Sequence, residues 1–279
     1  MIIDFHTHTF PDKIAAAALK KMQSDCHSAA FTEGTESALT ASMKDTGIDY
    51  SVILPVITNP LKTSSINRVS IENNGKNGLI YFGGIHPDTE NADDELKHLA
   101  SNGIKGIKIH PVYQNADIDD MRFLRILYKA AELDLTVITH AGDDIGFPGV
   151  VHCSPKMILN AVKEVGNVRL IAAHMGGWRN WEEVNELLAD TEIYIDTAFS
   201  LGEITPLDDG YYSPEELKLL NDERFVKAVR LFGSHRVLFG TDSPWDSQKK
   251  AIEQIASLPL STEEIENIFS NNALHILKM

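Results

Sequence analysis

The sequence has few cysteines, fewer basic than acidic residues, and no long hydrophobic run. Cys26 and Cys153 are the only cysteines, far apart and outside any C-x-x-C spacing, which excludes a disulfide framework and a thiolate zinc finger. With 25 basic and 40 acidic residues the formal net charge is -15, so the protein repels phosphate backbones and anionic lipids. We therefore expect neither nucleic acid nor a membrane as a partner.

No segment has the pattern of an export signal or a membrane span. The N-terminus reads Met-Ile-Ile-Asp-Phe-His, without a basic stretch before an apolar one. No run of about 18 apolar residues occurs anywhere in the chain. Together with the sparse cysteines, this predicts a cytoplasmic protein. The length of 279 residues is close to the roughly 250 of one (β/α)₈ barrel, so we expect a single domain over residues 1–279.

Short apolar runs rich in β-branched residues alternate with segments of helical periodicity. The runs are 2–5, 50–54, 79–85, 106–109, 135–139, 168–173, 192–196 and 237–240, and the helical segments include 121–133, 156–165, 181–188 and 224–231. Buried strands joined by helices indicate a parallel sheet, and eight such units favour closure. The predicted fold is an α/β (β/α)₈ TIM barrel, distorted, with extra N- and C-terminal helices at 12–25 and 262–277. These two helices are decorations or a homodimer contact.

Histidines gather where the apolar runs end. His6, His86, His110, His140 and His174 each end one run, and His8 follows His6 by two residues. Because the carboxyl ends of parallel strands meet at one rim of a barrel, we expect these imidazoles to lie close together. His6 and His8 share a strand face, with Cα atoms about 7 Å apart, close enough for two imidazoles to bind one ion.

The residues around these histidines favour a catalytic metal. Asp4 precedes His6, and Asp242 follows the last apolar run in Gly-Thr-Asp. Imidazoles with a carboxylate suit zinc or another borderline divalent ion better than calcium or magnesium. Such an ion activates a bound water and polarises a carbonyl. Asp242 is then placed to accept the proton of the water, and His174 to shuttle protons or stabilise an oxyanion.

The sequence resembles the amidohydrolase superfamily over its whole length, in the amidohydrolase-related branch that contains both decarboxylases and a lactonase. The family-like elements are Asp-Phe-His-Thr-His at 4–8, Gly-Ile-Lys-Ile-His-Pro at 106–111, Thr-His-Ala-Gly at 139–142, Ala-His-Met-Gly-Gly at 173–177 and Gly-Thr-Asp-Ser-Pro at 240–244. The resemblance implies one divalent ion, Zn²⁺ with Mn²⁺ as the alternative. Its implied ligands are His6, His8, His140 and Asp242, with His174 as a catalytic or supporting histidine.

Because of Lys108, the sequence leaves open whether the site binds one metal ion or two. It shares a strand face with His110, and a strand-four lysine in other superfamily members is carboxylated and bridges two metals. Burying an unpaired ammonium is costly, and carboxylation, a substrate anion or an ion pair would relieve that cost. We favour one ion, with Lys108 as a substrate or network residue, over a dinuclear site.

Other rim residues have two interpretations each. His110 either joins the site or satisfies loop backbone groups. Trp178 and Arg179 either bind an aromatic or carboxylated substrate or pack at a helix start. Asp143 and Asp144 either cap the next segment or support the metal site. Asp196 either hydrogen-bonds the rim or touches a ligand.

The leading hypothesis is therefore a metal-dependent hydrolase acting on an amide, lactone or ester of a small polar or carboxylated molecule through a metal-activated water. The alternative is a non-oxidative decarboxylase of an aromatic or unsaturated carboxylic acid that uses the same metal. A non-catalytic scaffold is a third reading, and the intact set of histidines with Asp242 argues against it.

Overall fold

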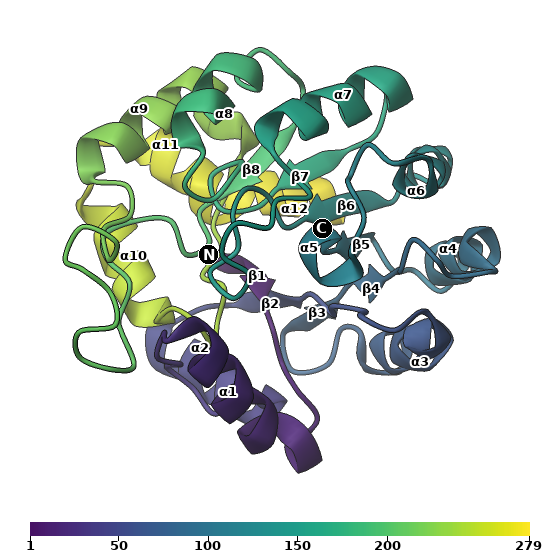
Figure 1. The fold of residues 1–279 in the computed structure, drawn as a ribbon, viewed down its shortest axis with the longest axis horizontal. Helices are drawn as coiled ribbons and strands as arrows, with labels where there is room; N and C mark the ends of the chain where they lie inside the picture. The colour runs from purple at the N-terminus through teal and green to yellow at the C-terminus, as the bar shows by residue number, and fades with distance from the viewer.

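The computed structural model describes residues 1–279, and its strands form one parallel barrel surrounded by helices (Figure 1). The strands are β1 (Ile3–Thr7), β2 (Tyr50–Ile53), β3 (Leu79–Tyr81), β4 (Gly83–Gly84), β5 (Gly106–Ile109), β6 (Thr136–Thr139), β7 (Leu170–Ala172), β8 (Tyr194–Asp196) and β9 (Val237–Leu238). The helices are α1 (Asp12–Cys26), α2 (Glu36–Thr46), α3 (Thr63–Asn73), α4 (Ala92–Ser101), α5 (Pro111–Gln114), α6 (Met121–Glu132), α7 (Pro155–Val165), α8 (Trp181–Leu187), α9 (Asp222–Phe232), α10 (Gln248–Ser257), α11 (Thr262–Glu266) and α12 (Asn272–Leu277).

All strand pairings are parallel. One sheet has the order β1-β2-β3 and the other β4-β5-β6-β7-β8-β9. The barrel closes between β9 and β1 through single backbone hydrogen bonds, from Phe5 N to Phe239 O (2.7 Å) and from Asp242 N to His6 O (2.8 Å). The predicted distorted (β/α)₈ barrel is confirmed.

The third predicted strand, at 79–85, is not continuous. Its first part, β3, pairs with β2, and its second part, β4, pairs with β5, with Phe82 between them. Phe82 is fully buried and meets Phe5 edge to face at 5.6 Å. A Cβ on Gly84 would lie 2.8 Å from the carbonyl oxygen of Pro55, so glycine lets the chain pass close to its neighbour while it changes partner.

The helices predicted at 121–133, 156–165, 181–188 and 224–231 are α6, α7, α8 and α9, with ends shifted by at most two residues. Each buries one apolar face against the strands, as α6 does with Phe123, Ile126 and Leu127. Side-chain caps begin three of them: Asp120 for α6, Ser154 for α7 and Asn221 for α9. These helices hold the strands from outside and leave the strand ends free for function.

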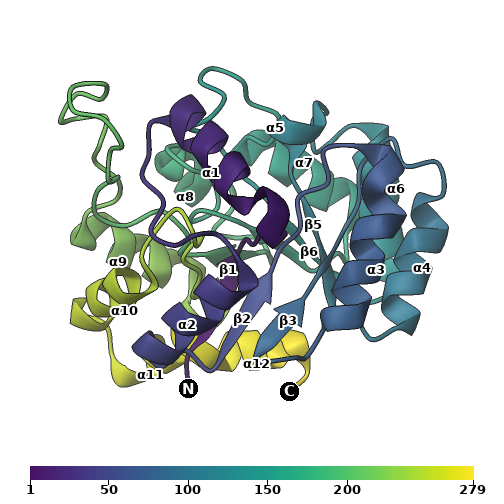
Figure 2. The ribbon, with the colours of Figure 1, turned by 90° about the horizontal axis from the view of Figure 1, so that it is seen from below.

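The C-terminal segment closes the end of the barrel where the strands begin (Figure 2). The helix predicted at 262–277 consists of α11, a π-helical turn at Asn267–Asn271 and α12, and Ser261 and Glu264 form a capping box at its start. Ala273, Ile276 and Leu277 join a buried cluster with strand residues such as Ile3. Since this end is filled, ligands have access only at the opposite rim, where the strands end.

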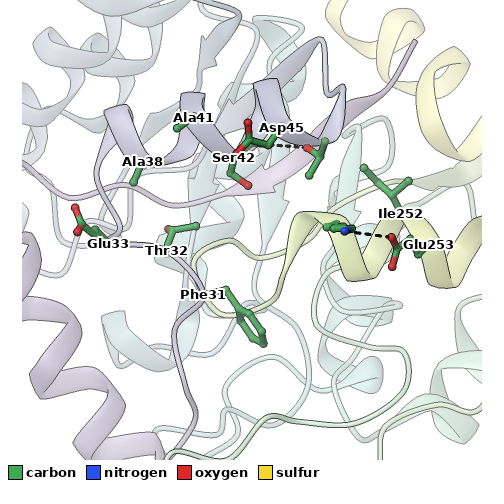
Figure 3. Close-up of a pocket in the computed structure, with 11 residues that line it drawn as sticks. Phe31, Thr32, Glu33, Ala38, Ala41, Ser42, Asp45, Ile252 and Glu253 are labelled. Atoms are coloured by element: carbon green, nitrogen blue, oxygen red, sulfur yellow. Dashed lines mark hydrogen bonds and ion pairs between the residues drawn. The ribbon is translucent and has the colours of Figure 1, made fainter.

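A cavity of about 830 Å³ lies outside the barrel mouth, between α2, α10 and the segment at Phe31 (Figure 3). Its lining includes Ala38 and Ser42 of α2 and Ile252 of α10, and none of the residues predicted for the site. The candidate chemistry therefore lies elsewhere. No helix combines the length and the apolar character needed to cross a bilayer.

Candidate metal centre

β1 and the loop after β9 bring three predicted ligands together. The pairing of β1 with β2 is irregular between Asp4 and Thr7, just where His6 leaves the regular ladder. Asp242 has a left-handed backbone (φ 62°) and its N–H is bonded to the carbonyl of His6. A non-glycine residue in this conformation is strained by about 1 kcal/mol or more and persists only where its surroundings fix it. The barrel seam thus places Asp242 beside the two histidines.

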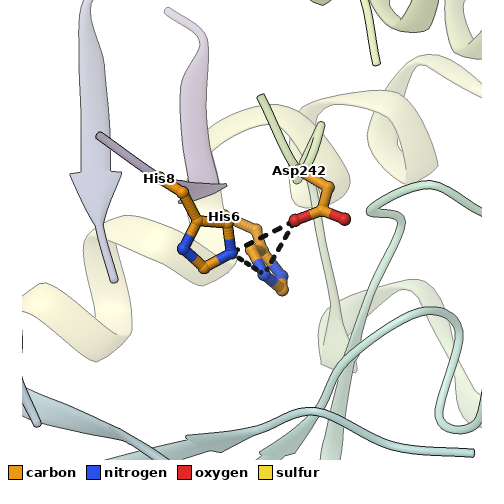
Figure 4. A group of neighbouring side chains, drawn as sticks. All are labelled: His6, His8 and Asp242. Atoms are coloured by element: carbon orange, nitrogen blue, oxygen red, sulfur yellow. Dashed lines mark hydrogen bonds and ion pairs between the residues drawn. The ribbon is translucent and has the colours of Figure 1, made fainter. Parts of the chain in front are cut away.

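The ligand atoms of these three residues have the spacing that one ion needs (Figure 4). Nε2 of His6 lies 3.1 Å from Nε2 of His8, and Oδ1 of Asp242 lies 3.4 Å and 3.2 Å from these two nitrogens. Donor atoms around a tetrahedral ion at about 2.0–2.1 Å are about 3.3 Å apart. The donor set fits a divalent cation without rearrangement.

The second ring nitrogens show that lone pairs face the centre. Nδ1 of His6 donates to Oδ2 of Asp196 (2.7 Å), and Nδ1 of His8 donates to the carbonyl of Leu54 (2.8 Å). Because a neutral imidazole carries one N–H, each Nε2 presents a lone pair to the other and to Asp242. Such an arrangement is repulsive unless a cation lies between the groups.

The pKa values of Asp242 and His6 agree with a site that binds a cation. Burial raises the pKa of Asp242, but its interactions with His8, His6 and His174 outweigh burial and hold that pKa well below its usual range. Burial, together with the charge of Lys108, holds the pKa of His6 well below its usual value. The site therefore holds an ionised carboxylate beside the neutral imidazole of His6.

His140 and His174 continue the same pattern. Nε2 of His140 donates to the carbonyl of Asp143 (3.0 Å), and Nδ1 of His174 donates to the carbonyl of Ala198 (3.0 Å). Their remaining nitrogens face each other at 3.1 Å. Burial lowers the pKa of His140 to about 3, with Lys108 adding to the effect, and lowers that of His174 to about 4, with His140 adding to it. Both rings are thus neutral, and their lone pairs meet.

His174 links the two pairs of histidines. Its ring lies 5.2 Å from that of His6 and 4.8 Å from that of His140, measured between centroids. His140 does not belong to the group of His6, His8 and Asp242, whose ligand atoms all lie within 4.8 Å of one another. Its place among the ligands remains a prediction.

Asp196 is a residue of the candidate site whose role the sequence left undecided. One carboxylate oxygen accepts from His6, and the other accepts from the backbone N–H of His174 (2.8 Å) and of Ala198 (3.1 Å). The carboxylate is fully buried, and burial raises its pKa. It orients His6 and the left-handed backbone of His174 (φ 60°) at once. Its position at the end of an apolar run was the signal available in the sequence.

Lys108 points into the barrel and is 1% exposed. Its Nζ lies 3.3 Å from Nε2 of His6, its one hydrogen-bond partner. Burial lowers the pKa of Lys108 to about 8, opposed in part by Asp196 and Asp242. Since no carboxylate forms an ion pair with it, a substrate anion or carboxylation remains as the way to offset its burial.

A second cluster of two histidines and an aspartate lies at the ends of β5 and β6. Oδ2 of Asp144 is 3.5 Å from Nε2 of His110 and 3.7 Å from Nε2 of His140. The two rings stack at 4.3 Å. Nδ1 of His110 accepts from Tyr113 N, so the N–H of that ring points at Asp144. Here the nitrogens that face the carboxylate carry hydrogens, which a metal site does not allow.

Trp178 and Arg179 do not face the ligand atoms. Trp178 is 5% exposed, stacks on Phe199 and donates its indole N–H to the carbonyl of Phe199 (3.1 Å). The guanidinium of Arg179 lies 4.5 Å from the Trp178 ring centroid and donates to the carbonyl of Glu216. Both side chains pack in the loop after β7, and this packing accounts for their positions. Their predicted role in substrate binding gains no support from this placement.

Comparison with known proteins places this geometry in context. An uncharacterised TIM-barrel protein from Bordetella bronchiseptica matches with a TM-score of 0.75 at 16% identity, covering 99% of this chain and 98% of its own. A 5-carboxyvanillate decarboxylase from Novosphingobium aromaticivorans, complexed with manganese and 4-hydroxy-3-methoxy-5-nitrobenzoic acid, matches at 0.71 and 14%, covering 100% and 96%. A 2,6-dihydroxybenzoate decarboxylase from Rhizobium matches at 0.65 and 15%, covering 99% and 98%. These likenesses show the fold.

The curated proteins contain no sequence that matches this chain. The sequence model described as Amidohydrolase matches residues 3–279, nearly the whole chain. That match agrees with the resemblance seen in the five rim motifs. The protein belongs to the amidohydrolase family, whose members are metal-dependent enzymes, either hydrolases or decarboxylases.

Proposed function

We propose that this enzyme is a non-oxidative decarboxylase of an aromatic or unsaturated carboxylic acid, and that His6, His8, His140 and Asp242 hold its divalent ion. The observation that carries the proposal is the convergence of imidazole lone pairs and an ionised carboxylate beside the buried ammonium of Lys108. Two proteins of the same fold, named as decarboxylases of aromatic acids, support this choice over hydrolysis.

Each residue has a distinct role in such a reaction. When bound, the ion supplies a Lewis acid that holds an oxygen of the substrate. Lys108 attracts the carboxylate of the substrate into the barrel through its positive charge. Loss of carbon dioxide breaks a carbon–carbon bond and leaves its electron pair on carbon, which must then take a proton. In the proposed step, Nε2 of His174, whose Nδ1 donates to the carbonyl of Ala198, takes up a proton from solvent water and delivers it to that carbon.

Two observations bear on which divalent ion binds, and they favour different metals. Imidazole ligands suit zinc and several other divalent ions, and the decarboxylase from Novosphingobium aromaticivorans is named with manganese. We propose one divalent ion per chain, with manganese and zinc as the two to test. Reconstitution of metal-free protein with each, followed by activity and metal content, decides between them.

Hydrolysis through a metal-activated water is the second candidate. The observation that favours it is the ionised state of Asp242, whose pKa lies well below its usual range because its interactions with His8, His6 and His174 outweigh burial. An ionised carboxylate at this position is able to accept a proton from an attacking water. The substrate would then be an amide, lactone or ester.

Isotope labelling separates the two functions. We would incubate the metal-loaded protein with hydroxylated aromatic acids, and with lactones and amides, in D₂O or in water enriched in ¹⁸O. Decarboxylation releases carbon dioxide and leaves one deuterium on the carbon that lost it, without ¹⁸O in the product. Incorporation of ¹⁸O into the product of a lactone or amide, with no release of carbon dioxide from any acid, would replace decarboxylation by hydrolysis.

A further inference from the structure

The loop after β6 holds Asp144 in a fixed position at the mouth of the barrel. Gly142 has a left-handed backbone (φ 83°), and a Cβ there would lie 2.3 Å from Trp178 N. Its own N–H donates to the carbonyl of Cys153 (2.8 Å), and the N–H of Asp143 donates to the carbonyl of Trp178 (3.0 Å). Backbone contacts on both sides therefore define where the next residue, Asp144, places its carboxylate.

One oxygen of that carboxylate has no hydrogen bond. Oδ1 accepts from Gly146 N (2.7 Å), which is the capping role that the sequence allowed. Oδ2 has Nε2 of His110 at 3.5 Å and Nε2 of His140 at 3.7 Å, beyond the roughly 2.7–3.2 Å of a hydrogen bond. Asp144 is only 8% exposed. Oδ2 thus has ring N–H groups facing it but none within hydrogen-bond distance, so a ligand hydroxyl that reaches it can supply a shorter hydrogen bond.

His110 provides a donor next to this acceptor. Its Nδ1 faces the backbone N–H of Tyr113 at 3.5 Å, a long contact that favours the tautomer with the hydrogen on Nε2. Its ring is held between Tyr113, edge on at 4.3 Å, and His140, stacked at 4.3 Å. A hydroxyl group donates and accepts through one atom, whereas an ammonium only donates and a carboxylate only accepts. The donor and acceptor together therefore favour a hydroxyl over an ammonium or a carboxylate.

We propose that Asp144 and His110 form a subsite for a hydroxyl group of the substrate, beside the metal centre, and that Asp144 determines specificity for it. The hydroxyl donates to Oδ2 of Asp144 and accepts from Nε2 of His110. The inference rests on the proposed function, because the same molecule must reach the metal. His140 connects the hydroxyl subsite with the metal centre, since its ring stacks on His110 and its Nδ1 faces His174.

The test compares binding of 2-hydroxybenzoate, 3-hydroxybenzoate and benzoate to the metal-loaded protein by calorimetry. Wild-type protein should prefer a hydroxylated acid, and Asp144→Asn should weaken binding of that acid by about tenfold. Binding of benzoate should change less than about threefold. Asp143→Asn is the matched control, because Oδ1 of Asp143 accepts from Asn180 (3.2 Å), and it should leave all three affinities unchanged.

Metal content, measured in every variant, separates the possible failures. Equal weakening of all three acids, or an unchanged preference, would contradict the subsite and leave the metal centre intact. Loss of the metal in Asp144→Asn would make Asp144 a ligand and overturn the subsite. If metal-loaded wild-type protein binds none of the three acids, the proposed substrate class fails and the hydroxyl subsite fails with it.

Discussion

Two clusters in the barrel mouth have the same composition and opposite chemistry. His6, His8 and Asp242 lie at the seam of the barrel, and His110, His140 and Asp144 lie at the ends of β5 and β6. In the first cluster both Nε2 atoms present lone pairs to the carboxylate, because each Nδ1 donates elsewhere. In the second, the Nε2 atoms that face the carboxylate carry hydrogens.

This difference teaches that residue type does not define a metal site. The hydrogen-bond acceptor on the far side of each imidazole determines whether that imidazole can bind a metal, because the acceptor fixes which ring nitrogen keeps its hydrogen. For the first cluster these acceptors are Asp196 and the carbonyl of Leu54. For His140 the carbonyl of Asp143 holds the hydrogen on the side of the second cluster and turns the lone pair toward His174. We therefore expect the first cluster to bind a cation and the second to form hydrogen bonds.

Asp242→Ala should break the first cluster with the largest effect. We expect metal content to fall from about one ion per chain to less than about a tenth, and turnover to fall at least about 10³-fold. His140→Ala should also reduce metal content sharply. Elemental analysis of purified variants measures this, with Asp144→Asn as the control from the second cluster. Full metal content in both Asp242→Ala and His140→Ala would refute the ligand assignment.

His174→Gln should separate binding of the metal from catalysis. Nε2 of His174 faces His140 and is the proposed proton donor, so we expect turnover to fall about 10²- to 10⁴-fold. Metal content should stay near one ion per chain. Activity and metal content measured on the same preparation test this. A variant that loses its metal would show that His174 is itself a ligand.

Asp196→Asn tests whether an acceptor behind a ring defines the site. An amide nitrogen facing Nδ1 of His6 would favour the tautomer with the hydrogen on Nε2, which removes a ligand lone pair. We expect metal affinity to fall about 10- to 100-fold. Competition with a chelator measures it, and Asp143→Asn serves as the control. Unchanged affinity would mean that the tautomer of His6 does not depend on Asp196.

The smallest expected effect concerns Cys153, which lies beneath the second cluster. A thiolate there could recruit a soft metal, but burial raises the pKa of Cys153 to about 12, so the group is a thiol at pH 8. We expect no labelling of Cys153 by iodoacetamide in native protein at that pH, and full labelling after denaturation. Cys153→Ser should leave metal content unchanged. Rapid labelling of native protein would show that the second cluster has an accessible thiolate.

The fold was predictable because its signals are local. Apolar runs and helical periodicity depend on residues close in sequence, and the four helices at 121–133, 156–165, 181–188 and 224–231 begin and end near the predicted positions. The split of the strand at 79–85 was not predictable, because it depends on close contacts of Gly83 and Gly84 with Leu99, Ile57 and Pro55. Those contacts join segments far apart in the chain.

The candidate site was predictable only in its residue types. Parallel strands must bring His6, His140 and His174 to one rim. The direction of each ring depends on single carbonyls in loops, such as that of Ala198 behind His174, and a sequence pattern carries no signal for them. Trp178 shows the same limit, since its burial against Phe199 depends on how two loops pack.

Anomalous diffraction at the absorption edge of bound manganese or zinc tests the difference between the clusters most directly. We predict one peak per chain, within about 2.0–2.3 Å of Nε2 of His6, Nε2 of His8 and an oxygen of Asp242. No peak should lie between His110 and Asp144. A peak at the second cluster, or fully loaded crystals without one at the first, would contradict the metal centre.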